Sequence, residues 1–284
     1  MSEACQNCYA ESLAHRYGHD VWGKGGARRT FGEKHWNEPV RWNRKAQEAG
    51  EPALVFCASM ADVFEDHPTW ETERPRLWEL VARTPWLTWQ LLTKRPENIS
   101  SMVPDAWYAP GAWPVNVWVG TTVESQRWAD VRLPLLLKVP APVRFVSCEP
   151  LFGEVDLDLV GLARELAGGP VGQRGADWVI AGGESGPKAR PSHPDWFRSL
   201  RDQCAAAGVP FLFKQWGEWV PETHARAPLT ERAFFSRRFV DPEGQDRYSQ
   251  GSAAVFKVGK KAAGWMLDGR TWDQIPERKV ACGL

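Results

Sequence analysis

The chain has 284 residues, a length that favours one domain of barrel size over a small module or two full enzyme domains. Thirty-five Lys and Arg residues balance 35 Asp and Glu residues, so no net charge holds the chain on nucleic acid or on an anionic membrane. The apolar content of 43% and the aromatic content of 12% exclude a disordered chain. No apolar run approaches the roughly 20 residues that span a bilayer and no secretion signal opens the chain, so we expect a cytoplasmic protein.

Two cysteines near the start, Cys5 and Cys8, form the motif CQNCYAE at the head of a pattern typical of a helix. Thiols at this spacing can bind one metal ion or one cluster, because the turn between them points both sulfurs to the same side. Three alternatives stay open: a redox dithiol, a zinc site completed by His15 and His19, and an inert surface pair.

A basic stretch interleaved with tryptophans follows this first helix pattern. Its members are Lys24, Arg28, Arg29, Arg41, Arg44 and Lys45, with Trp22, Trp36 and Trp42 between them. Such mixing can bind phosphate backbones, and it is also typical of a solvated face. Nucleic acid is therefore one candidate partner.

Six short apolar runs, rich in Val, Leu, Phe and Trp, recur along the chain with starts 28 to 35 residues apart. They lie at 53–59, 86–93, 115–122, 143–148, 178–183 and 209–216. Continuous apolar runs are typical of parallel strands covered on both faces. Helix patterns separate them, the clearest at 75–83 and 194–207. We therefore predict six parallel strands in chain order, in an open doubly wound sheet or a (β/α) barrel.

Polar residues follow nearly every predicted strand, and this favours the barrel, in which the carboxyl ends of the strands converge on one site. The residues at these tips include Asp62, Lys94, Arg95, Glu124, Glu149, Glu184, Ser185, Lys214 and Gln215. We predict that Asp62, Lys94, Glu124, Glu149, Glu184 and Lys214 open into one cavity. Loops are polar in most proteins, so a polar residue at the end of one strand alone does not indicate a functional site.

The motif GGESG at 182–186 follows the fifth run. Its glycines would let backbone N–H groups approach an anion, and Glu184 could bind an amino group or a ribose hydroxyl. A tight turn from strand to helix would need the same residues. Trp216 and Trp219 lie at the sixth tip, where a ring could stack on a base or pack in the core.

Three regions follow from these patterns. Residues 1–220 form the (β/α) barrel domain, 221–254 a polar insertion or lid without periodicity, and 255–284 a C-terminal cap.

Several motifs, taken in chain order, point to one family: CQNCYAE, WGKGGARRTF, HWNEPVRWNRKA, SMADVF, LLTKRPEN, WVGTTVES, CEPLFG, VIAGGESGPKARP, FLFKQWGEW and VGKKAAGWMLDGRTWDQIP. Together they resemble the phage Gp37/Gp68 family of the DUF5131 type, a group similar to radical S-adenosylmethionine (SAM) proteins. The resemblance runs from Ser2 to about Pro276. The family's reaction is unassigned, so the resemblance implies a cofactor class rather than a substrate.

This resemblance implies a partial (β/α) TIM-like barrel of the radical SAM type. Its first strand would be followed by a three-cysteine loop that holds a [4Fe-4S] cluster, with SAM on the open iron. Cys5 and Cys8 match the second and third of these cysteines. The first cysteine would stand about seven residues before Cys5, and the first strand further upstream. We therefore expect a shortened chain whose cluster is labile or absent and whose strand at 53–59 has an exposed edge.

With a complete site, the cluster would cleave SAM to a 5′-deoxyadenosyl radical that abstracts a hydrogen atom from a substrate, and an electron donor would be a partner. The residues expected to bind SAM are Gly182, Gly183, Glu184 and Ser185. Those expected in the chemical step are Lys94, Glu149 and Lys214. Those expected to bind substrate are Asp62, Arg95, Glu124 and Gln215.

Two other functions stay open. One is a nucleic-acid modification or repair enzyme that uses the same radical chemistry. The other is a non-catalytic phage binding protein built on a decayed barrel, which the missing cysteine favours. Whether the chain is an enzyme depends on whether it can hold the cluster.

Overall fold

The structure is a computed structural model, and it describes residues 2–23, 25–159, 175–225 and 228–281. Lys24 and Cys282 lie outside the described residues. The chain forms two compact units. Unit 1 consists of Met1–Tyr9, Thr122–Pro134 and Phe145–Pro276, and unit 2 of Ala10–Thr121, Leu135–Arg144 and Glu277–Leu284.

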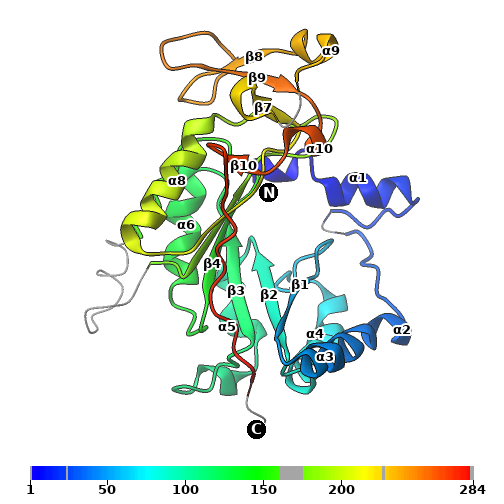
Figure 1. The fold of residues 1–284 in the computed structure, drawn as a ribbon. Helices are drawn as coiled ribbons and strands as arrows, with labels where there is room; N and C mark the ends of the chain where they lie inside the picture. Colours follow the sequence, from blue (N-terminus) through cyan, green and yellow to red (C-terminus); the bar gives the residue numbers. More distant parts are fainter. Residues whose placement is uncertain (1, 24, 160–174, 226–227, 282–284) are drawn as a thin grey trace. The chain divides into compact units, whose positions relative to one another are not determined.

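A sheet of six strands follows the chain in the order β1-β2-β3-β4-β5-β6 (Figure 1). The strands are β1 (Ala53–Cys57), β2 (Leu87–Thr93), β3 (Val117–Thr122), β4 (Arg144–Cys148), β5 (Trp178–Gly182) and β6 (Phe211–Gln215). Neighbours pair in parallel within β1-β2-β3 and within β4-β5-β6. Backbone hydrogen bonds from Val119 to Val143 (3.1 Å) and from Val123 to Ser147 (2.9 Å) connect β3 and β4.

The prediction of six parallel strands in chain order is therefore confirmed, with each end within two residues of its expected place. Every residue of β3 is buried, as the continuous apolar runs indicate for strands covered on both faces. The strand order is compatible with a partial (β/α) barrel, and the fold is mixed α/β. β1 is an edge strand of this sheet, as expected.

In unit 2, helices α3 (Glu38–Ala49) and α4 (Pro68–Arg83) contact each other, and α3 contacts β1 and β2. The helix expected at 75–83 begins earlier, at Pro68, so its predicted start is wrong and Pro75 lies inside the helix. The reason is an N-cap: the ring of His67 accepts a hydrogen bond from the backbone N–H of Thr69 (3.2 Å). Further helical elements between η1 (Glu3–Cys5) and β3 are α1 (Tyr9–Arg16), α2 (Glu33–Trp36), η2 (Pro96–Asn98), α5 (Ile99–Met102) and η3 (Asp105–Tyr108).

In unit 1, helix α8 (Pro194–Ala207) has the bounds that the sequence predicts. Pro194 occupies its first turn, and Gly208 ends it in the left-handed conformation with φ 65°. Its apolar side chains face β5 and β6 and join the core of the unit. Helix α6 (Gln126–Leu136) follows β3. The 3-10 turn η1 (Glu3–Cys5) is the first element of the chain.

Residues 221–254, expected as a polar insertion or lid, contribute to a small antiparallel sheet with the order β7-β9-β8. Its strands are β7 (Trp219–Pro221), β8 (Arg238–Val240) and β9 (Ala253–Lys257). η4 (Glu222–His224) and α9 (Glu231–Phe234) lie in the same stretch. The stretch lacks visible periodicity because β7 and β8 have only three residues each.

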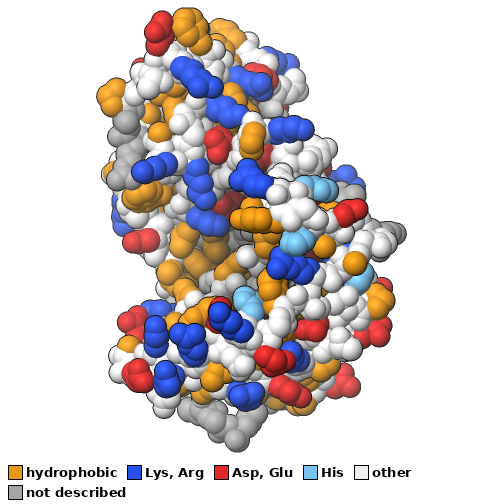
Figure 2. Space-filling view, turned by 90° about the vertical axis from the view of Figure 1, so that its right-hand side faces the viewer, with side chains coloured by type: hydrophobic (Ala, Val, Ile, Leu, Met, Phe, Trp, Pro, Cys, Tyr) orange, Lys and Arg blue, Asp and Glu red, His pale blue; other side chains and the backbone are white. Residues whose placement is uncertain are grey.

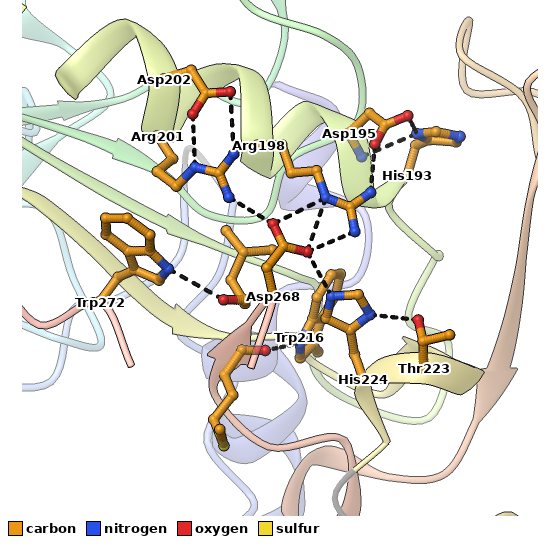
Figure 3. A network of polar contacts seen from close by, with 12 residues as sticks. His193, Asp195, Arg198, Arg201, Asp202, Trp216, Thr223, His224, Asp268 and Trp272 are labelled. Atoms are coloured by element: carbon orange, nitrogen blue, oxygen red, sulfur yellow. Dashed lines mark hydrogen bonds and ion pairs between the residues drawn. The ribbon is translucent and has the colours of Figure 1, made fainter. Parts of the chain in front are cut away.

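The end of unit 1 packs on α8 through a cluster of charged groups around Asp268 (Figure 3). After α10 (Lys260–Ala263), the strands β10 (Met266–Leu267) and β11 (Arg270–Thr271) form a hairpin that turns at Asp268. The Asp268 carboxylate accepts hydrogen bonds from Arg198 (2.7 Å), Arg201 (2.6 Å) and His224 (3.0 Å). These donors, Arg198 first, hold the pKa of Asp268 well below its ordinary value.

Candidate functional site

The Asp62 carboxylate, predicted to bind substrate, lies beyond β1 and is surrounded by donors from its own unit. Its Oδ2 accepts hydrogen bonds from Thr93 Oγ1 (3.0 Å), the backbone N–H of Lys94 (3.2 Å) and Arg95 Nη1 (2.8 Å). Its Oδ1 accepts one from the backbone N–H of Phe64 (3.0 Å). The structure therefore brings Asp62, Lys94 and Arg95 together in unit 2, where the carboxylate orders the turns after β1 and β2.

One arginine of the basic stretch, Arg28, serves the folding of unit 2. Its Nε and Nη2 donate to the Glu65 carboxylate (2.9 and 2.8 Å), and its Nη1 donates to the carbonyls of Val21 (2.9 Å) and Gly26 (2.7 Å). This contact raises the pKa of Arg28 and lowers that of Glu65. Arg28 is therefore engaged with the protein, and binding of nucleic acid by this stretch stays a prediction.

The face of the molecule in Figure 2 carries Lys and Arg side chains interspersed with Asp and Glu. This agrees with the formal net charge of zero and gives no broad single-sign field on that face. Among the described residues, no helix is both long enough and apolar enough to cross a membrane.

Four polar side chains meet at the carboxyl ends of β4, β5 and β6. The Glu149 carboxylate accepts hydrogen bonds from Lys214 Nζ (2.9 Å) and from Gln215 Nε2 (3.0 Å). The same Nε2 lies 3.1 Å from Ser185 Oγ. The Lys214 side chain is 56% exposed, so a ligand in solution can reach it, whereas Gln215 is buried.

One atom of this cluster has no partner among the described residues. Gln215 Oε1 is fully buried and accepts no hydrogen bond, while Nε2 faces the carboxylate of Glu149. The orientation of the amide follows from these neighbours, because only the N–H side can face an acceptor. A buried carbonyl oxygen without a donor costs about 1–3 kcal/mol, so Gln215 Oε1 lacks a donor that the described residues do not supply.

Both glycines expected to bind SAM have neighbours within the protein that account for them. A Cβ at Gly183 would lie 1.9 Å from the carbonyl oxygen of Trp216, and one at Gly182 would lie 3.2 Å from the carboxyl carbon of Glu149. Gly183 therefore lets two backbone segments approach each other, and Gly182 leaves room for the Glu149 carboxylate. Packing inside unit 1 explains both residues without a ligand.

Glu184, expected to bind the amino group of SAM, holds an arginine. Its Oε1 and Oε2 accept hydrogen bonds from Arg190 Nη2 (2.6 Å) and Nε (2.9 Å), and Oε2 also accepts from the Arg190 backbone N–H (2.7 Å). The Glu184 side chain is buried. With this bidentate pair in place, the carboxylate presents no free face to an amino group, which argues against the expected role.

Glu124, expected to bind substrate, is also buried against an arginine. Arg132 Nη1 donates to Glu124 Oε2 (2.8 Å) and to the carbonyl of Thr122 (2.7 Å). The guanidinium lies 3.9 Å from the centre of the Trp128 ring. Glu124 Oε1 and Arg132 Nε are buried and unpartnered among the described residues. Because neither side chain reaches solvent, Glu124 lies outside the accessible cluster at Glu149.

The structure therefore groups the predicted tip residues in pairs and small clusters. Asp62, Lys94 and Arg95 belong to unit 2, while the tips at Glu124, Glu149 and Glu184 belong to unit 1. Their opening into a single cavity concerns both units and stays a prediction. Sequence reasoning missed Arg132 and Arg190, although Arg190 lies in the motif GGESGPKARP six residues after Glu184.

The cysteines in the described part of the chain do not provide the ligands that a [4Fe-4S] cluster requires. Cys5 and Cys8 are half-buried free thiols, and Cys148 and Cys204 are buried free thiols. Among the described residues, no group of three or more His, Cys, Asp or Glu side chains is placed to hold a metal ion. A cluster that leaves one iron open for SAM needs three thiolates, so these donors do not fit it. By the same observation, the described part of the chain forms no zinc site from Cys5, Cys8 and histidines.

Comparison with known proteins gives a family without an assigned activity. A family model described as "Protein of unknown function (DUF5131)" matches residues 1–276. No curated protein and no solved structure matches the chain.

Proposed function

Since the chain belongs to the DUF5131 family, whose model spans residues 1–276, we propose that it binds a small zwitterionic ligand at the carboxyl ends of β4–β6 and that this ligand is SAM. The observation that carries the proposal is the cluster of Glu149, Lys214 and Gln215. It combines a carboxylate and an ammonium group in one ion pair with a neighbouring amide whose buried carbonyl oxygen is unpartnered among the described residues. The carboxyl ends of parallel strands are the usual binding edge of (β/α) folds.

The cluster complements the methionine end of SAM, which carries an ammonium group and a carboxylate. Glu149 is the partner for the ligand's ammonium group and Lys214 the partner for its carboxylate. In the free protein these two side chains neutralise each other at 2.9 Å, so binding exchanges one ion pair for two. The ligand's ammonium has N–H donors to spare, and one of them would satisfy Gln215 Oε1.

The choice of SAM among zwitterionic ligands rests on the resemblance of the sequence to radical SAM proteins. Hydrogen abstraction by a 5′-deoxyadenosyl radical is the chemistry that this resemblance implies. Because the donors among the described residues do not fit the cluster, the proposal contains binding and no radical step.

Titration calorimetry with SAM tests the proposal. We expect saturable binding, and we expect Glu149→Gln and Lys214→Gln each to weaken it at least about tenfold, which corresponds to the loss of one charge-assisted contact of roughly 1.4 kcal/mol or more. Glu222→Gln and Lys261→Gln are matched controls, since both side chains are exposed in unit 1 and lie outside the cluster. Their affinity for SAM should equal that of the wild type.

Competing ligands separate the two parts of the proposal. Methionine should bind more weakly than SAM, because it lacks the nucleoside. If methionine competes as well as SAM, the site takes an amino acid and the choice of SAM is wrong. If no zwitterion binds, or if Glu149→Gln binds SAM like the wild type, the site itself is wrong.

A further inference from the structure

We infer that unit 1 contains a clamp that holds the cysteine segment, residues 2–8, and thereby sets the reactivity of the Cys5 and Cys8 thiols. The clamp consists of Glu184, Arg190, Glu124, Arg132 and Trp128. This inference goes beyond ligand binding at Glu149 and does not rest on it. It assigns a role to two buried carboxylates that the ligand site does not use.

The first arm of the clamp runs from Glu184 through Arg190. Glu184 fixes the guanidinium from one side with two hydrogen bonds, and the ring of Phe152 lies 3.8 Å from the guanidinium carbon. The remaining N–H groups of Arg190 point to the cysteine segment. Nη2 donates to the carbonyl of Glu3 (3.0 Å), and Nη1 donates to Gln6 Oε1 (3.3 Å). The arginine therefore joins the turn after β5 to the residues on both sides of Cys5.

The second arm runs from Glu124 through Arg132 to Trp128 on α6. Arg132 lies against the Trp128 ring at 3.9 Å, which fixes the plane of the indole. The indole Nε1 then donates to Glu3 Oε2 at 2.7 Å. This hydrogen bond is the main cause of the lowered pKa of Glu3, so the segment presents a charged carboxylate to the indole.

A third contact holds the end of the segment nearer α1. Asn7 Nδ2 donates to the carbonyl of Lys188 (3.0 Å), in the same turn that carries Arg190. The segment itself has a single 3-10 turn, η1, so most of its order comes from these outside partners. Three donors from the rest of unit 1 and one from the segment thus lie on both sides of Cys5 and approach Cys8.

The geometry favours a clamp over a ligand cradle. Both oxygens of Glu184 are taken, and Glu124 is fully buried, so neither carboxylate can turn toward a ligand without leaving its arginine unpaired. Both arginines are instead part of a path that ends on Glu3. Two independent paths that meet on one residue fix the segment in position and orientation, whereas a single contact would allow it to rotate.

Site-resolved alkylation of the native protein with iodoacetamide, followed by mass spectrometry, tests the clamp. In Arg190→Gln we expect alkylation of Cys5 and Cys8 at least about fivefold faster than in the wild type, because local opening becomes more frequent. Cys148 and Cys204 are internal controls, since both are fully buried in the same unit. Burial raises the pKa of Cys204 to about 12, so these thiols react only when the unit unfolds.

Three further variants complete the test. Arg198→Gln removes another bidentate arginine from unit 1 and should leave Cys5 and Cys8 at the wild-type rate. Arg190→Lys keeps the positive charge but not the bidentate guanidinium, and we expect an alkylation rate between those of the wild type and Arg190→Gln. Trp128→Phe keeps an aromatic ring beside Arg132 and removes the N–H donor to Glu3, so it should accelerate both thiols with less risk to folding than loss of the whole side chain.

The clamp is supported if Arg190→Gln or Trp128→Phe accelerates Cys5 and Cys8 while Cys148 and Cys204 stay protected. It is wrong if Cys5 and Cys8 keep the wild-type rate in both variants, or if they react faster only together with the two buried thiols. Binding of SAM is not read in this experiment, so the clamp and the ligand site can fail separately.

Discussion

At the scale of residues, the space around Gly183, directly after β5, explains why this position is a glycine. A Cβ at Gly183 would stand 1.9 Å from the Trp216 carbonyl oxygen, far inside any van der Waals contact, and that oxygen belongs to the backbone. Neither segment can yield without moving β5 or β6. The glycine is therefore required for the backbone after β5 to approach the backbone at Trp216 after β6, whatever the protein binds.

Replacement of Gly183 by alanine should destabilise unit 1. We expect Gly183→Ala to lower the free energy of unfolding by about 2 kcal/mol or more, because the clash with backbone can be relieved only by moving a main-chain segment. Gly153→Ala is the matched control, since a Cβ there meets nothing within 4 Å, and its effect should stay within about 0.5 kcal/mol. Urea unfolding measures both. A Gly183→Ala variant of wild-type stability that loses a ligand would show that the glycine serves binding instead.

At the scale of elements, a carboxylate joins the β10–β11 hairpin to α8. The hairpin has two residues in each strand, too few to be stable alone. Asp268 at its turn accepts from Arg198, Arg201 and His224, and Figure 3 shows both arginines reaching it from the same face of α8. The carboxylate thus fixes the hairpin to the helix.

Asp268→Asn should loosen this contact. We expect a loss of about 1–2 kcal/mol at neutral pH, less than for a buried pair, because a third of the side chain is exposed to screening water. The folded pKa of Asp268 is lowered, so its stabilisation is present above the ordinary value of 3.8 and is lost as the pH falls through the folded value.

The difference in unfolding free energy between wild type and Asp268→Asn should therefore be constant from about pH 5 to 8 and shrink in stronger acid. Asp246→Asn removes a more exposed carboxylate paired with Arg238 and should cost less than about 0.5 kcal/mol. A difference that grows on acidification would contradict the assignment.

At the scale of the whole molecule, metal chemistry depends on how many ligands the fold gathers at one place. The described residues hold Cys5 and Cys8 in one segment, while Cys57, Cys148 and Cys204 lie in or beside the sheet and its helices. Burial raises the pKa of the Cys57 thiol to about 12, which makes it a poor thiolate donor. Among the described residues, only Cys5 and Cys8 stand together in one segment, and two thiols are fewer than a [4Fe-4S] cluster needs.

Anaerobic incubation of the chain with ferrous iron and sulfide should therefore give well below four irons per molecule and no cleavage of SAM. Iron and sulfide analysis after desalting, together with chromatography of the nucleoside products, measures both. A variant with Cys5→Ala and Cys8→Ala shows how much of the retained iron is adventitious. A stable four-iron product that cleaves SAM would overturn the statement that the donors do not fit.

The sequence by itself determined the six parallel strands, their order and the bounds of α8. Continuous apolar runs and helix-end residues are local patterns, and the backbone obeys them wherever the segment lies. It also indicated which residues stand at the strand tips, including Glu149, Lys214 and Gln215. The predicted start of α4 was wrong because histidine is not among the residues typical of an N-cap, so the sequence does not mark His67 as one.

Only the tertiary structure decided what each tip residue contacts. Glu184 was expected to face a ligand, yet it holds Arg190, which reaches Glu3 across 187 residues of chain. Trp128 meets the same Glu3 across 125 residues. No periodic pattern in the sequence predicts hydrogen bonds between such distant segments. They depend on where packing brings the side chains rather than on the order of residues along the chain.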